Sequence, residues 1–113
     1  MSNFLFLFRG GHERSSQQSP EEMQAEMQKW IDWMRKLKEQ GQLVDGLPLG
    51  KEGKVVSGKG DIITNGPFAE GSEIVGGYLI VTANSLDEAV VISKGCPNYH
   101  YGGTTEVREI MTI

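Results

Sequence analysis

The chain has 113 residues, a length typical of one domain, and we expect residues 1–113 to form a single unit. Fifteen acidic residues against eleven basic ones give a net charge of −4 with no basic cluster, so we expect no nucleic-acid partner. One cysteine excludes an intrachain disulfide and fits a reducing compartment, and no apolar run reaches the ~18 residues of a membrane span. We therefore expect a cytoplasmic protein with no membrane partner.

The first expected element is a strand over residues 3–9. Successive side chains of a strand point to opposite faces, and here both faces are apolar: Phe4, Phe6 and Phe8 on one, Leu5 and Leu7 on the other. Both faces of this strand must therefore be covered by other parts of the structure. A polar loop that carries His12 follows it.

A helix is expected to begin after Ser19. Ser19 is a good N-cap, Pro20 suits the first helical position, Glu22 completes a capping box, and Gly41 can end the helix. Its apolar residues recur three and four positions apart, which aligns them on one stripe: Met23, Met27, Trp30, Met34 and Leu37. This spacing favours packing in the core over a ligand-binding groove.

Residues 42–53 are expected to form a connection that contains Gly and Pro. Its segment 46–52 superficially resembles a phosphate-binding loop, but it is one residue short between glycines, and Glu52 stands where Ser or Thr would bind the metal. We therefore expect no cofactor. Residues 54–57 and 61–64 are predicted to form a hairpin around Gly58-Lys59-Gly60.

The loop after this hairpin carries most of the candidate ligand-binding residues. Asn65-Gly66 favours a turn, Phe68 can anchor the loop by burial, and Glu70 and Glu73 place two carboxylates close together. A strand is expected over 74–81, with a Gly-Gly pair at 76–77 that is typical of a bulge or of close approach by another backbone or a ligand. A purely structural loop and a ligand-contacting loop both remain open.

A second helix is expected to begin after Ser85 and to stop before Pro97, and a last strand is expected over 104–113. The resulting order of strand, helix, hairpin, strand, helix and strand predicts an α+β fold, a ferredoxin-like split βαβ sandwich. Both helices of such a fold cover one face of the sheet. The apolar second face of the strands then predicts a partner sheet, and hence a homodimer.

The candidates for chemistry are few. His100 lies in a loop where it is either exposed or a proton shuttle, as is His12 in its own loop, and Cys96 is expected to be a small packed residue rather than a nucleophile. Glu106 and Arg108 share a face of the last strand, where they either form a surface ion pair or line a cleft. Two histidines and one cysteine at wide spacing predict no metal site.

The segment Asn65-Gly66-Pro67-Phe68-Ala69-Glu70 resembles the Asp-Gly-Pro-Phe-Ala-Glu motif of the YCII-related family, in the branch called DGPF-domain proteins. Similar segments follow the family's order over nearly the whole chain. This resemblance implies a dimeric α/β barrel with a cleft between sheet and loops. The chain departs from the motif at Asn65, where the family has the aspartate suspected of acid–base work.

Two functions are compatible with these observations. The first is a non-catalytic ligand-binding or regulatory module that binds a small molecule, a reading that the missing aspartate favours. Its candidate ligand-binding residues are Asn65, Phe68, Glu70, Glu73 and Arg108. The alternative is a small-molecule enzyme similar to the family's dehydrochlorinase-like members, in which Glu70 with His12 or His100 would act as acid and base.

Overall fold

The structure of the protein, a computed structural model, describes residues 1–10, 19–50, 52–66 and 74–113. Its elements in chain order are β1 (Ser2–Arg9), α1 (Pro20–Glu39), β2 (Leu43–Pro48), β3 (Gly53–Ser57), β4 (Ile62–Gly66), β5 (Val75–Ala83), α2 (Leu86–Ser93), the 3-10 helix η3 (Pro97–Tyr101) and β6 (Thr104–Glu109).

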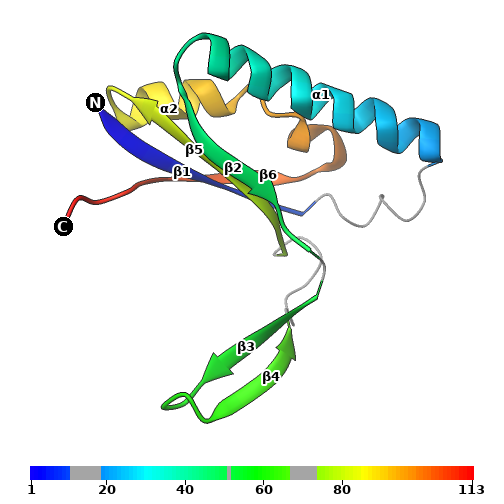
Figure 1. The fold of residues 1–113 in the computed structure, drawn as a ribbon, viewed down its shortest axis with the longest axis vertical. Helices are drawn as coiled ribbons and strands as arrows, with labels where there is room; N and C mark the ends of the chain where they lie inside the picture. Colours follow the sequence, from blue (N-terminus) through cyan, green and yellow to red (C-terminus); the bar gives the residue numbers. More distant parts are fainter. Residues whose placement is uncertain (11–18, 51, 67–73) are drawn as a thin grey trace.

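The main sheet has four strands in the order β2-β5-β1-β6, and every neighbouring pair is antiparallel. Both α-helices lie on one face of this sheet (Figure 1). Without the hairpin formed by β3 and β4, the chain follows the order β-α-β-β-α-β of a ferredoxin-like fold. The predicted α+β class is confirmed, and the arrangement is compatible with the predicted ferredoxin-like fold.

The core lies between this sheet and the two helices. The alternation predicted for β1 is confirmed, because its three phenylalanines are buried on the helix side. They pack with further buried side chains from β5, α1, α2 and the segment before η3: Leu79, Val81, Ala83, Trp33, Leu37, Ala89 and Cys96.

Helix α1 begins as predicted. The Ser19 hydroxyl accepts a hydrogen bond from the Glu22 backbone N–H at 3.1 Å, and the Glu22 side chain accepts one from the Ser19 backbone N–H at 3.5 Å. These two reciprocal bonds form the expected capping box. Gly41 follows the helix with φ +73°, a conformation that favours glycine.

The predicted core stripe of α1 is only partly correct. Leu37 is buried and Trp30 and Met34 are half-buried, but Met23 and Met27 are exposed, and Trp33, outside the predicted stripe, is buried. Figure 1 shows the N-terminal end of α1 extending beyond the sheet, so the first turns have no strand beneath them. Periodicity gives the apolar face of a helix, but not how far the neighbouring layer extends.

The segment 42–53, expected to be a connection, instead contains the edge strand β2, which pairs with β5. Its glycine and proline, which suggested a loop, suit this edge position. A Cβ on Gly46 would lie 2.3 Å from Leu79 Cδ1 and 2.8 Å from the Tyr78 carbonyl oxygen, so only glycine fits there. Pro48 ends the strand, and an edge strand tolerates a residue without an N–H.

Strands β3 and β4 form the predicted hairpin, with Gly58 and Gly60 at φ +66° and +92° in its turn. The hairpin does not join the main sheet. It projects away from the sheet on the side opposite the helices (Figure 1). The radius of gyration, 15.4 Å, exceeds the about 13 Å of a compact chain of this length for this reason.

Other predicted elements differ in detail. Asn65 lies within β4 rather than in a turn. The predicted strand over 74–81 is β5, Val75–Ala83, and the last strand ends at Glu109 instead of Ile113. Ser85 caps α2 as expected, by accepting a hydrogen bond from the Glu88 backbone N–H at 3.1 Å.

Candidate functional site

The face of the main sheet that points away from the helices is here called the open face. Residues paired directly across antiparallel strands share a face, and the register pairs Leu5 with Ile80 and Leu7 with Tyr78. These four side chains are half-buried, and Leu47 on β2, which pairs with Tyr78, is exposed. The centre of the open face is therefore apolar.

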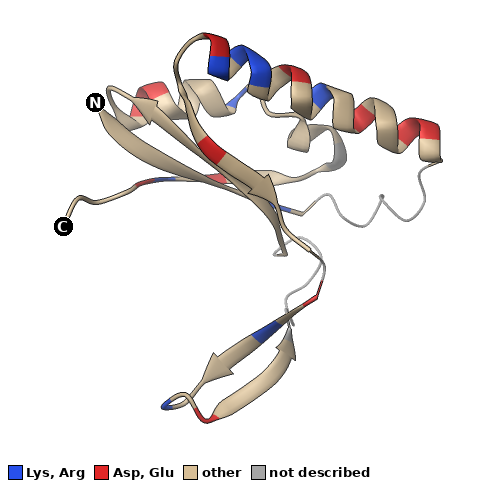
Figure 2. Ribbon diagram, in the orientation of Figure 1, with Lys and Arg blue, Asp and Glu red and all other residues tan. Residues whose placement is uncertain are grey.

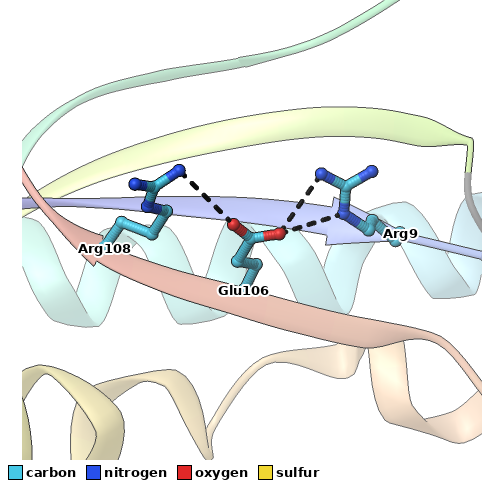
Figure 3. A network of polar contacts seen from close by, with 3 residues as sticks. All are labelled: Arg9, Glu106 and Arg108. Carbon is cyan, nitrogen blue, oxygen red and sulfur yellow. Dashed lines mark hydrogen bonds and ion pairs between the residues drawn. The ribbon is translucent and has the colours of Figure 1, made fainter.

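Three charged residues border this apolar centre on the side of β6, and Figure 3 shows them in front of the strands, with the helices behind. Arg9, at the end of β1, donates from Nε and Nη2 to Glu106 Oε1 at 3.3 and 3.2 Å. Arg108 Nη1 lies 3.9 Å from Glu106 Oε2. We call Arg9, Glu106 and Arg108 the charged network.

The register places the charged network on the open face, because Glu106 pairs with Leu7 and Arg108 with Leu5. The prediction that Glu106 and Arg108 share a face is thus confirmed. Arg9 was not among the residues predicted from the sequence, although the period of two that runs through Leu5 and Leu7 also leads to Arg9. This alternation along β1 could have indicated that Arg9 shares a face with Leu5 and Leu7.

The ion pairs of the charged network contribute little to the stability of the fold. Ion pairs between exposed groups contribute about 0–1 kcal/mol each, and the Glu106 side chain is 40% exposed. Among the residues that the structure describes, this border carries two guanidiniums and one carboxylate. The Arg108 side chain is 71% exposed and its contact with Glu106 is long, so its N–H groups can reach a ligand in solvent.

Asn65, the other predicted ligand-binding residue that the structure describes, is not brought to this network within one chain. Asn65 lies on the projecting hairpin, where its Oδ1 accepts a hydrogen bond from Lys54 Nζ at 2.7 Å. Strands β4 and β6 belong to different sheets. Phe68, Glu70, Glu73 and His12 lie outside the described residues.

His100 lies elsewhere, in η3, which packs against α1 and β6. Its side chain is exposed, and within the described ranges no hydrogen bond or ion pair joins it to a carboxylate. The described part of the chain therefore offers no histidine–carboxylate pair in a pocket.

The model of the YCII-related domain matches residues 7–113, which is nearly the whole chain and includes most of the open face, the charged network and the hairpin. The chain belongs to the YCII-related family. No curated protein matches the sequence.

In this YCII-related chain Cys96 is a packed residue, as predicted. It caps η3, where its Sγ accepts a hydrogen bond from the Asn98 backbone N–H at 3.3 Å. Burial raises the pKa of the Cys96 thiol to about 11, although the bond from Asn98 acts in the opposite direction. The thiol is thus neutral at pH 7 and a poor nucleophile.

The described residues of the YCII-related chain form neither a metal site nor a helix that could span a membrane. No group of three or more His, Cys, Asp or Glu among them is placed to hold a metal ion. No helix among them is long and apolar enough to cross a membrane. Figure 2 shows acidic residues at the beginning of α1, where Glu21 and Glu22 form part of the first turn, and basic residues farther along, with Lys36 and Lys38 in the last turn.

Proposed function

We propose that this protein is a homodimeric ligand-binding or regulatory module of the cytoplasm that packs through its open face and binds a small anionic molecule beside the charged network. The observation that carries the proposal is an apolar sheet face bordered by two arginines that share one glutamate. We also assign the chain to the DGPF branch of the family, on the motif at residues 65–70.

The apolar centre of the open face supports the dimer. Leu5, Leu7, Tyr78 and Ile80 line up across two central strands, and Leu47 extends the row to the edge. Contiguous exposed apolar patches are uncommon on monomers and mark surfaces that other molecules cover. A second sheet packed about 10 Å away would bury these side chains.

The charged network supports an anionic ligand. A guanidinium carries N–H donors in a fixed fork that matches a carboxylate or a phosphate. Glu106 holds Arg9 by two hydrogen bonds, whereas Arg108 keeps a single long contact and most of its surface exposed. Among the predicted ligand-binding residues we therefore assign Arg108 the direct contact with the anion; Asn65, Phe68, Glu70 and Glu73 stay candidates.

Binding of simple anions tests this function. Inorganic phosphate and benzoate are titrated into the protein, and binding is followed by isothermal titration calorimetry and by NMR shifts. We expect one of the two to bind with an affinity that falls as ionic strength rises, and Arg108→Gln to weaken it by on the order of tenfold. We expect no chemical conversion of either probe.

The matched control is Lys59→Gln, which removes one positive charge from the exposed turn of the hairpin. It should leave the affinity unchanged. Equal effects of both substitutions would mean that only net charge matters, and binding unchanged by Arg108→Gln would disprove the assigned contact.

A further inference from the structure

The hairpin carries the one asparagine of the chain that precedes a glycine. Asn65 is followed by Gly66, whereas Asn3, Asn84 and Asn98 precede larger residues. Glycine has no Cβ, so its backbone nitrogen is sterically open and its backbone turns freely. Asn65 is exposed near the end of β4, where water reaches its side-chain amide. Both the sequence and the position therefore favour a chemical change of this side chain.

A cation lies on the carbonyl oxygen of the same side chain. Lys54 pairs with Asn65 across the hairpin, and its Nζ donates a hydrogen bond to Asn65 Oδ1 at 2.7 Å. An ammonium group on this oxygen draws electrons from the carbonyl carbon, which becomes a better electrophile. It also lies where negative charge would develop if a nucleophile added to that carbon, and a donor in this place stabilises an oxyanion.

We propose that Asn65 is a site of spontaneous deamidation, in which Gly66 supplies the nucleophile and Lys54 stabilises the oxyanion. The backbone nitrogen of Gly66 loses its proton to solvent, and its electron pair forms a bond to Cγ of Asn65 while negative charge moves to Oδ1. Collapse of this intermediate breaks the bond from Cγ to Nδ2, and Nδ2 takes up a proton and leaves as ammonia. The product is a cyclic imide.

Water completes the reaction, and no oxidant or reductant is needed. Its oxygen adds to one of the two carbonyl carbons of the imide, and the bond from that carbon to the Gly66 nitrogen breaks. Opening at Cγ gives an aspartate in the normal main chain. Opening at the backbone carbonyl carbon gives an isoaspartate, in which the main chain runs through the former side chain.

The reaction requires the end of the hairpin to open. An extended backbone holds the next nitrogen away from the side-chain carbonyl carbon, so the pair reacts from a conformation outside the strand. Gly66 is the last residue of β4, and the hairpin is a two-stranded sheet separate from the main sheet. Isolated hairpins are marginally stable and strand ends fray at little cost in free energy. The reactive conformation is therefore accessible at Asn65.

Asn84 provides a comparison within the same chain. It is also exposed, and a small residue, Ser85, follows it. Its Nδ2 donates a hydrogen bond to Glu88 Oε2 at 3.2 Å, so its charged neighbour is an anion at the leaving nitrogen. Ser85 is also held as the N-cap of α2 by a hydrogen bond from the Glu88 backbone N–H. We therefore expect Asn84 to deamidate much more slowly than Asn65.

Deamidation changes the charge of the hairpin. With an aspartate at position 65, a carboxylate oxygen lies beside the Lys54 ammonium group, and the two form an ion pair. The net charge of the chain falls by one unit from −4. An isoaspartate adds a carbon atom to the main chain, which shifts the pairing of Gly66 with Gly53. Neither the proposed ligand nor a second subunit takes part in this change.

Mass spectrometry of the aged protein tests the site. The purified protein is kept at neutral pH and physiological temperature for several weeks, and its peptides are compared with those of a fresh sample. We expect the peptide with Asn65 to gain the mass difference between NH2 and OH, and to separate into aspartyl and isoaspartyl forms on chromatography. Peptides with Asn84 or Asn98 should stay unchanged. Absence of conversion at Asn65, or equally fast conversion at Asn84, would overturn the proposal.

Substitutions test the two assigned roles. Gly66→Ala should slow the conversion severalfold, because a Cβ crowds the attacking nitrogen. Lys54→Met should slow it by on the order of threefold to tenfold, as expected for the loss of one hydrogen bond to the oxyanion. Lys54→Arg keeps a cationic donor and should retain the parent rate. The control Lys59→Met removes a positive charge from the turn of the same hairpin and should change nothing.

Unfolded protein provides the second control. In concentrated urea the hairpin is lost, so the parent and Lys54→Met should convert at the same rate. Equal rates for these two proteins in the folded state would overturn the role of Lys54 and leave the deamidation site standing. A rate unaffected by Gly66→Ala would overturn the cyclic imide, since direct hydrolysis of the side-chain amide does not use the Gly66 nitrogen.

Discussion

At the scale of single residues, Cys96 shows how burial sets chemistry. Its thiol is enclosed at the start of η3, and burial raises its pKa to about 11. The folded chain therefore retains this proton at pH values where the unfolded chain has lost it. The resulting contribution to stability is complete below pH 9 and is lost as the pH rises from about 9 to about 11.

We expect the free energy of unfolding to fall more steeply between pH 9 and 11 in the parent protein than in Cys96→Ala. The difference should be about 2 kcal/mol, since each unit of pKa shift corresponds to about 1.4 kcal/mol. Urea unfolding at several pH values measures it, and the comparison cancels the titration of the lysines and tyrosines. Parallel pH dependences in the two proteins would contradict a raised thiol pKa.

Asn65 and Arg9 mark the limit of residue-scale prediction. An Asn-Gly pair suits a turn, but the same pair ends β4 here, where Asn65 binds Lys54 on the opposite strand. Local preference does not include a cross-strand partner. Arg9 follows two apolar residues on the same face, and its role depends on Glu106, which is 97 positions away in the sequence.

At the scale of elements, α1 shows which part of a helix packs. Trp33 is 9% exposed and its ring lies 6.2 Å from Phe8 and 5.9 Å from Trp30, whereas Trp30 is only half-buried. A Cβ added to Gly95 would lie 2.8 Å from Trp33 Nε1. The stripe predicted from the sequence contained Trp30, whereas the more buried tryptophan is Trp33, about one helical turn farther along α1.

We expect Trp33→Ala to lower the free energy of unfolding by about 3–5 kcal/mol, because it leaves a large cavity in the core. Trp30→Ala should cost less, about 1–3 kcal/mol, since part of that side chain already contacts solvent. Chemical denaturation followed by circular dichroism compares them. A larger loss of unfolding free energy for Trp30→Ala than for Trp33→Ala would mean that Trp30 is the main core residue of α1, and would contradict the packing of α1 in the structure.

Elements were predicted best where local chemistry is strong. The capping box of Ser19, the cap at Ser85 and the glycine turn of the hairpin are short-range signals, and the structure confirms all three. Strand β2 was missed because its glycine and proline are explained only by its position at a sheet edge. Edge position depends on topology, which no local window of sequence contains.

At the scale of the whole molecule, the order of the helices and of every strand except β2 was predicted from the sequence, and with it the fold class. The sequence did not predict that the hairpin would leave the sheet. Its β-branched residues fit a paired strand equally well in a sheet or in a projecting arm. The candidate site was predicted only in part for the same reason, since Arg108 lies on the main sheet and Asn65 on the arm.

A substitution on the open face can show whether a second subunit covers this face. Leu7 lies at the centre of that face, between Tyr78 on β5 and Glu106 on β6. In a single chain Leu7→Lys is tolerable, because a lysine side chain can extend its ammonium group into solvent. In a dimer packed through this face, the two-fold axis would bury two such ammonium groups without partners.

We therefore expect Leu7→Lys to raise the dissociation constant of the dimer by at least about a hundredfold, because an unpaired buried charge costs several kcal/mol. Light scattering at micromolar concentration should then give the monomer mass, with a circular dichroism spectrum like that of the parent. Leu7→Met keeps the volume and the apolar surface, and should remain dimeric. A Leu7→Lys protein that still has the dimer mass would mean that the subunits meet elsewhere, and that the half-buried leucines of β1 face water in the assembled protein.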